Sequence, residues 1–94
     1  MAVEVTDNDS LHRFEIAVDG KVAGFAEYRT EPGAVVFTHT EIDPAFEGRG
    51  LGSRLIRDAL DQTRAAGLQV DPQCPFVRAF IEQHPDYADV VAAA

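Results

Sequence analysis

The chain has 94 residues, a length that allows one domain, residues 1–94, built around a single hydrophobic core. Its 16 acidic and 8 basic residues give a formal net charge of -8, which argues against nucleic acid as the main partner, because phosphate binding needs a basic surface. The negative charge permits a cationic partner such as an amine, although solubility alone also explains it.

The composition also bears on compartment and cofactors. Cys74 is the one cysteine, so no intrachain disulfide can form, and three scattered histidines show no metal-ligand spacing. No apolar run approaches the ~20 residues that span a bilayer, and the N-terminal stretch MAVEVTDNDS lacks the regions of a signal peptide. We therefore expect a monomeric cytoplasmic protein without a metal and without membrane contact.

Strand patterns fill the first half of the chain, where residues alternate between apolar and polar or are rich in Val, Phe, Thr and Ile. The expected strands are residues 3–5, 14–18, 21–28 and 34–42. Asp19-Gly20 is a strong signal for a two-residue hairpin, and Glu31-Pro32-Gly33 marks a second turn. These segments predict an antiparallel meander.

The second half changes to a helical period. An apolar stripe predicts a helix that begins at Leu51, and Gly67 is expected just after its C-cap. Residues 68–70 predict a short strand, and Cys74 and Pro75 open a second helix, with Cys74 at its N-cap. The order predicts an α+β fold, a mostly antiparallel sheet (a β-meander) followed by α-β-α, with two helices packed on the sheet.

Glycines alternate with other residues from Gly48 to Gly52, directly before the first predicted helix. A helix N-terminus carries unsatisfied N–H groups and about half a positive charge, and glycines let an anion approach this backbone closely. Arg49, Arg54 and Arg57 would add positive charge locally. The stretch therefore predicts a phosphate-binding loop, and a tight helix entry that serves packing alone is the alternative.

Two common phosphate loops do not fit this stretch. A P-loop needs GxxxxGK[ST], and no lysine stands here, whereas a dinucleotide loop needs a third glycine where this chain has Ser53. A Rossmann unit also places its loop after the first strand of a larger parallel sheet.

The loop instead resembles that of the GNAT superfamily of acyl-CoA-dependent N-acyltransferases. In that superfamily the pyrophosphate loop follows a long antiparallel strand and has the pattern Q/R-x-x-G-x-G/A. The stretch EGRGLG at 47–52 matches at both glycines. It departs at Glu47, which removes one expected donor or cation near the phosphates.

Three further segments, HTE at 39–41, CPF at 74–76 and HPDY at 84–87, narrow the resemblance to the short YjdJ-like branch of that superfamily. The match extends from about Phe14 to Tyr87. It implies an N-acetyltransferase that moves an acetyl group from acetyl-CoA to a primary amine of a small molecule, such as a polyamine, or of a protein.

Carried over to this chain, the resemblance assigns the coenzyme A pyrophosphate to the loop and the pantetheine arm to the end of the preceding strand. The implied contacts are Gly48, Arg49, Gly50, Leu51, Gly52, Ser53 and Arg54 in the loop, and the main chain of Ile42 and Asp43 in the strand.

The resemblance also places Cys74 near the thioester. At a helix N-cap its thiol lies at the positive end of the dipole, which favours reactivity. Cys74 could be a nucleophile that is transiently acylated, or it could line the acyl pocket while the amine attacks the thioester directly. A small buried core residue is the third reading.

Direct attack needs a neutral amine, so a base should assist. Glu41 and His39 are the candidates. They share strand parity with Phe37 and Val35, so we expect all four to point to one face, where apolar neighbours would help the carboxylate take up a proton. Polar side chains on a partly wet strand face are the alternative.

Larger relatives often use a tyrosine of the second helix as the general acid, and this helix has Phe76 and Phe80 instead. That difference motivates a second hypothesis, a module that binds CoA or acyl-CoA without efficient transfer. A third hypothesis is a thiol sensor built on Cys74.

Overall fold

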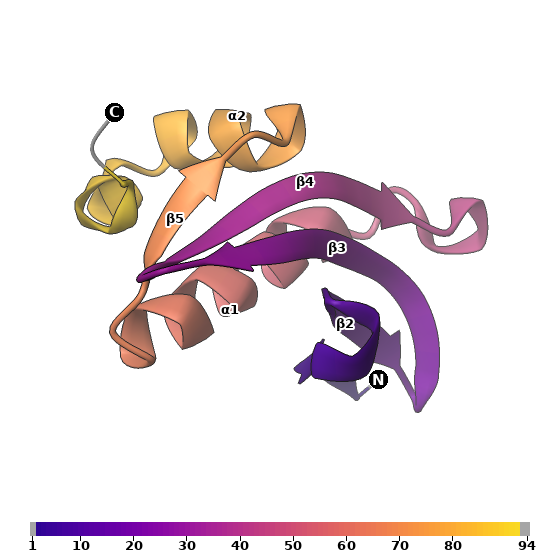
Figure 1. Cartoon of the computed structure of the whole chain (residues 1–94). Helices are drawn as coiled ribbons and strands as arrows, with labels where there is room; N and C mark the ends of the chain where they lie inside the picture. The colour runs from indigo at the N-terminus through magenta and orange to yellow at the C-terminus, as the bar shows by residue number, and fades with distance from the viewer. Residues whose placement is uncertain (1, 93–94) are drawn as a thin grey trace.

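The computed structural model describes residues 2–92, in which a five-stranded sheet packs against two α-helices (Figure 1). The strands are β1 (Val3–Asn8), β2 (Arg13–Val18), β3 (Lys21–Glu31), β4 (Ala34–Ile42) and β5 (Gln69–Pro72). The helices are α1 (Leu51–Ala65) and α2 (Pro75–Gln83), with the short 3₁₀ helices η1 (Asp9–Leu11), η2 (Pro44–Phe46) and η3 (Pro85–Val90).

The strands lie in the order β1-β2-β3-β4-β5, and neighbours are antiparallel except β4 and β5. The last pair is parallel because α1 carries the chain back across the sheet between them. The predicted α+β fold, an antiparallel meander followed by α-β-α, is confirmed. β1 is longer than predicted, and β5 lies slightly later in the chain than predicted.

The two hairpin turns follow from backbone conformations that few residues adopt. Asp19 and Gly20 both have positive φ, 50° and 83°, as the predicted two-residue hairpin requires. The second turn is shorter than expected, because Glu31 still pairs with Ala34 across the sheet. Gly33 makes that turn possible with a φ of 73°.

Much of the hydrophobic core lies between the sheet and α1, and buried side chains of α2 and η3 belong to the same cluster. The inward side chains are Phe14, Ile16, Ala26, Tyr28, Val35 and Phe37 from the sheet, and Leu51, Leu55, Ile56, Ala59 and Leu60 from α1. In Figure 1, α1 runs below β3 and β4, and α2 lies above them. The predicted apolar stripe of the first helix is confirmed as its buried face.

The helix ends also follow their local signals. Gly67 has a φ of 75° just after the C-cap of α1. Cys74 is the N-cap of α2, and Pro75 is the first helical residue, where its missing N–H is harmless. Both predictions are confirmed.

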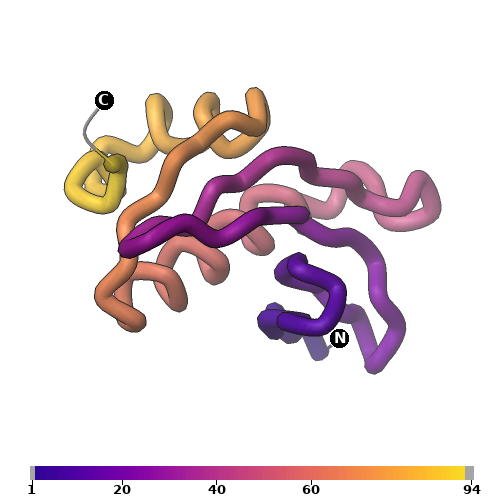
Figure 2. The backbone as a smooth tube through the Cα atoms, in the orientation of Figure 1, coloured from indigo at the N-terminus to yellow at the C-terminus, as the bar shows by residue number. Residues whose placement is uncertain are grey.

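β4 and β5 separate at one end of the sheet. They pair only between residues 34–37 and 69–72, after which the Cys74 N–H donates to the Phe37 carbonyl oxygen at 2.8 Å and the chain enters α2. β4 continues to Ile42, so the two strands diverge (Figure 2). Within the described residues, the edge of β4 on this side therefore has no partner strand over residues 38–42.

Candidate active site

The glycine loop, residues 47–52, connects the end of β4 and η2 to the N-terminus of α1. Gly48 and Gly50 have φ values of 80° and 73°, a left-handed conformation that other side chains disfavour. Gly50 is the N-cap of α1 and has no side chain that could accept a hydrogen bond. Helix geometry therefore leaves the first N–H groups of α1 without an acceptor inside the helix, facing the space before it.

A cavity of about 350 Å³, the loop cavity, opens in front of these N–H groups. It is lined by the glycine loop apart from Arg49, by Ser53, and by Ile42 of β4, Phe46 of η2 and Phe76 of α2. A Cβ at Gly52 would lie 2.8 Å from Cζ of Phe76, so glycine is the residue that leaves room for the ring. Phe76 is 44% exposed although it is apolar, because its ring borders this opening.

Two predicted cationic contacts lie at the loop. The Arg49 guanidinium carbon is 5.4 Å from the centre of the Phe46 ring, which is a cation–π distance. Arg54 Nε lies 2.8 Å from Oδ2 of Asp58, one turn further along α1. This ion pair is exposed, and such pairs contribute little to stability, so an anionic ligand could compete for Arg54.

Arg57 lies elsewhere than expected. Its guanidinium carbon is 5.6 Å from the ring centre of Phe80 and 5.7 Å from that of Tyr87, so it faces α2 and η3 rather than the loop. The Tyr87 hydroxyl donates to Oδ1 of Asp61 at 2.7 Å. Burial, followed by the hydrogen bond and charge of Asp61, raises the pKa of Tyr87, with Arg57 opposing the change. Tyr87 thus serves to join η3 to α1.

The two predicted pantetheine contacts, Ile42 and Asp43, differ in where their main-chain polar groups point. The Asp43 N–H donates to the Ala23 carbonyl oxygen of β3 at 2.7 Å, and the Asp43 carbonyl oxygen accepts from the Phe46 N–H at 2.8 Å. The polar groups of successive strand residues point to opposite edges, so those of Ile42 point into the gap beside β5. The Asp43 N–H is thus hydrogen-bonded within the fold, whereas the main-chain polar groups of Ile42 face the gap.

A β-bulge decides where His39 and Glu41 point. Consecutive residues of β3 pair with Phe37 and His39, so Thr38 is an extra residue in β4. One extra residue exchanges the two faces of a strand. The expectation that His39 and Glu41 share a face with Phe37 and Val35 is therefore wrong.

His39 and Glu41 instead form a pair on the exposed face of the sheet. His39 Nε2 and Glu41 Oε1 are 2.9 Å apart, and the side chains are 53% and 59% exposed. The Phe25 ring of β3 lies beside them, with its centre 6.4 Å from that of the His39 ring. An imidazole held by a carboxylate in reach of solvent can exchange protons with a nearby amine.

Cys74 lies on the other side of β4. Its Sγ is 3.4 Å from Oγ1 of Thr40, and the residue is 3% exposed. Because strand residues alternate, Thr40 points away from His39 and Glu41, so the structure does not bring the three predicted catalytic residues into one cluster. Sequence reasoning missed Thr40, since only the bulge puts this side chain on the same face as Ala26, where it meets Cys74.

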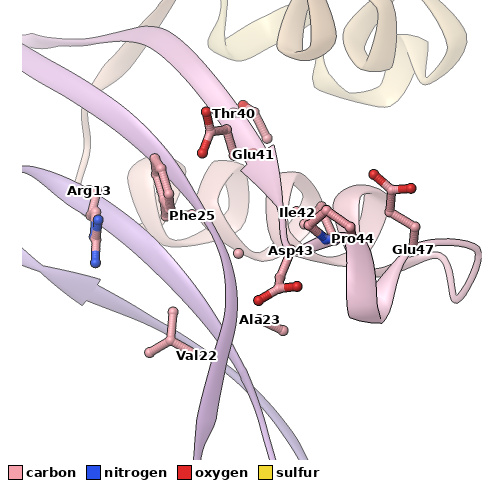
Figure 3. A pocket seen from close by; sticks show the side chains of 11 residues that line it. Arg13, Val22, Ala23, Phe25, Thr40, Glu41, Ile42, Asp43, Pro44 and Glu47 are labelled. Atoms are coloured by element: carbon pink, nitrogen blue, oxygen red, sulfur yellow. The ribbon is translucent and has the colours of Figure 1, made fainter.

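A larger cavity of about 750 Å³, the face cavity, lies on the exposed face of the sheet (Figure 3). Its lining combines carboxylates at the end of β4 and in the glycine loop with apolar side chains of β3, namely Glu41, Asp43, Glu47, Val22 and Phe25. Ile42 and Glu47 line both this cavity and the loop cavity, so the two cavities meet at the end of β4.

Other kinds of site find no support in residues 2–92. This part of the chain contains no group of three or more His, Cys, Asp or Glu side chains that could hold a metal ion. No helix in it has both the length and the apolar character needed to cross a bilayer.

Comparison with known proteins points to one family. A family model described as GCN5-related N-acetyl-transferase matches residues 13–90. No curated protein is significantly similar in sequence.

Solved structures share the fold. A GCN5-like protein of Staphylococcus aureus, solved by NMR, superposes with a TM-score of 0.72 at 20% identity, over 97% of this chain and 89% of that chain. The ribosomal-protein-S18-alanine N-acetyltransferase of Escherichia coli has a TM-score of 0.62 at 21% identity, over 76% and 49% of the two chains. A GNAT family acetyltransferase of Brucella melitensis, in complex with acetyl-CoA, has a TM-score of 0.55 at 27% identity, over 72% and 50%. The chain thus spans about half the length of the last two proteins.

Proposed function

The chain belongs to the GCN5-related N-acetyltransferase family, and from this premise we propose that it binds acetyl-CoA and transfers the acetyl group to a primary amine. One observation carries the proposal. Within the described residues, the glycine loop and the end of the β4 edge that lacks a partner strand border the same cavity, which supports a phosphate contact and a main-chain contact side by side.

The glycine loop supports the pyrophosphate contact. The first N–H groups of α1 face the loop cavity, and the positive end of the helix dipole favours an anion there. The residues that we assign to this contact are Gly48, Arg49, Gly50, Leu51, Gly52, Ser53 and Arg54. Glycine at 52 lets the Phe76 ring lie at the border of the loop cavity, because a Cβ there would be 2.8 Å from the tip of that ring.

The edge of β4 supports the pantetheine contact. Acetyl-CoA supplies the activated thioester, and its amide-containing arm needs main-chain partners along an extended edge. We assign this role to Ile42, whose polar groups point into the gap beside β5. We give Asp43 a smaller part, because its N–H already donates to Ala23.

The chemistry requires two proton movements. A C–N bond forms between the acceptor nitrogen and the acetyl carbonyl carbon, and the C–S bond breaks, so the CoA thiolate leaves with the electron pair. The amine must lose a proton, and the thiolate must gain one. We assign the removal of the amine proton to the His39–Glu41 pair, because both side chains are exposed and His39 Nε2 lies 2.9 Å from Glu41 Oε1.

We propose that Cys74 and Thr40 lie beside the thioester of bound acetyl-CoA. The Cys74 thiol is buried and hydrogen-bonded to Thr40, which suits a group that packs against the acyl chain or donates to the leaving sulfur. Burial favours this role over that of an acylated nucleophile, and it gives no support to a sensor that must meet dissolved oxidants. That the protein is a monomer and acts in the cytoplasm stays a prediction.

Two measurements on wild type and Cys74→Ala test the function. The first is a titration with CoA, and the second is intact-mass spectrometry after incubation with acetyl-CoA. We expect both proteins to bind CoA and neither to carry an acetyl adduct. An adduct on wild type alone would assign a covalent relay to Cys74. Absence of CoA binding would overturn the proposed function.

A module that binds CoA without efficient transfer is the second candidate. This candidate is favoured because Phe76 and Phe80 of α2 have no hydroxyl that could act as the general acid. The Tyr87 hydroxyl already donates to Asp61. Turnover with a panel of primary amines, compared with hydrolysis of acetyl-CoA, separates the two candidates. We expect amine acetylation above hydrolysis, and a module would give none.

A further inference from the structure

We propose that the face cavity is the acceptor site and that its acceptor is a small primary amine with an apolar segment, such as an arylalkylamine. This inference rests on the proposed function, because an acceptor matters only if acetyl transfer occurs. It is carried by the charge, the apolar surface and the position of the cavity.

The charge of the cavity selects a cation. The carboxylates of Glu41, Asp43 and Glu47 line it, and Arg13 is the basic residue in its wall. The Arg13 guanidinium is already paired with Glu15 at 2.8 Å, so its charge is offset. A protonated amine is therefore the complementary group, whereas an anionic acceptor would be repelled.

The apolar surface of the cavity selects more than a charge. Val22 is 44% exposed at its edge, and the Phe25 ring forms part of its wall. The Arg13 guanidinium carbon lies 4.5 Å from the centre of that ring, so Phe25 already packs against a flat cationic group. An aryl or alkyl segment would bury this surface, which a hydrophilic amine would leave wet. A volume of about 750 Å³ falls within the range of small-molecule sites.

The position of the cavity orients the amine. In Figure 3 the carboxylates of Glu41, Asp43 and Glu47 follow one another along the end of β4 and the loop and point in different directions, and Val22 and Phe25 of β3 lie to one side of them. An amine bound with its ammonium group at the carboxylates therefore lies beside Ile42 and Glu47, which also line the loop cavity. Glu41 of the His39–Glu41 pair lines the same cavity, so the nitrogen would lie near the proposed base and beside Ile42, the proposed pantetheine contact.

The test is an NMR titration of the ¹⁵N-labelled full chain without CoA. The probes are 2-phenylethylamine, 2-phenylethanol, which keeps the ring but lacks the charge, ethylamine, which keeps the charge but lacks the ring, and a short peptide with one lysine. We expect the first probe to shift the amides of Val22, Phe25 and Asp43. We expect it to bind about fivefold more tightly than the alcohol, from one favourable charge contact, and at least about fivefold more tightly than ethylamine, from one buried ring.

Matched variants separate local from general charge effects. The double variant Asp43→Asn/Glu47→Gln should weaken 2-phenylethylamine about tenfold, because it removes two carboxylates. The new amide oxygen at position 43 can still cap η2, as the Asp43 carboxylate does by accepting from the Ala45 N–H. The control Glu82→Gln removes one charge from the exposed surface of α2 and should leave the affinity unchanged. Val22→Ser should weaken the amine and the alcohol alike.

Each other outcome overturns the inference. Equal affinity for amine and alcohol, or an equal effect of Glu82→Gln, would mean that no local charge recognition exists. Shifts outside the face cavity would place the amine elsewhere, and tighter binding of ethylamine or of the lysine peptide would refute the small apolar amine. A CoA titration and an acetylation assay run beside it. If CoA binds and amines are acetylated but the double variant leaves KM unchanged, the inference fails and the function stands. If the probe binds here and CoA does not bind, the function fails instead.

Discussion

Replacing Gly52 with alanine tests whether a ligand reaches the backbone of the glycine loop. The new Cβ would lie 2.8 Å from Cζ of Phe76 and 3.5 Å from its two Cε atoms. Carbon atoms pack at about 3.5–4.0 Å, so the tip of the ring must move by roughly 1 Å. Phe76 is partly exposed and can rotate, and it borders the loop cavity that would receive the cofactor.

The free energy of unfolding should change little in Gly52→Ala. Alanine is favoured over glycine in a helix by up to ~1 kcal/mol, and a strained Phe76 rotamer costs ~0.5–1.5 kcal/mol. These terms nearly cancel, so Tm should stay within about 8 °C of wild type. The affinity for CoA should fall further, because losing one hydrogen bond to a charged group costs ~1.5–3 kcal/mol, which is roughly 10- to 150-fold.

Calorimetric titration with CoA and a thermal melt measure both quantities. The double variant Gly52→Ala/Phe76→Ala, compared with Phe76→Ala alone, shows whether the displaced ring or the methyl group itself blocks the ligand. A folded Gly52→Ala protein that binds CoA within twofold of wild type would refute the reasoning, because the ligand would then not approach this backbone.

Three other changes test separate parts of the structure. Burial, followed by the hydrogen bond and charge of Asp7, raises the pKa of Tyr28. The free energy of unfolding should therefore hold below pH ~10 and fall above it, where the tyrosine ionises in the unfolded chain first. Tyr28→Phe should reduce this alkaline loss of stability in urea unfolding, and an unchanged loss would contradict the reasoning. Gly67→Ala should lower the free energy of unfolding by ~1–2 kcal/mol because φ is 75°, and an unchanged urea midpoint would argue against this. Thr40→Val, which removes the hydroxyl 3.4 Å from Cys74 Sγ, should lower kcat while the Kd for CoA stays within about twofold of wild type. Thr40→Ser, which keeps the hydroxyl, should retain activity. An equal loss of activity in both variants would mean that Thr40 acts through packing instead.

Local signals in the sequence predicted the order of the elements and several of their ends. The Asp19-Gly20 turn, the stop at Gly67 and the start at Cys74 each depend on the conformation of one or two residues, which a sequence displays directly. The glycine loop was recognisable for the same reason. Its left-handed glycines and the amphipathic helix that follows are neighbours in the chain.

The candidate site was less predictable, because it depends on contacts between distant segments. The sequence by itself determined the α+β order, the loop at the mouth of α1 and the residue types that favour acyl transfer. The tertiary structure alone decided that His39 and Glu41 face the open side of the sheet while Thr40 meets Cys74. That arrangement follows from one extra residue, Thr38, in the pairing of β4 with β3. A strand's own residues do not reveal a bulge of this kind, because the partner strand sets the register.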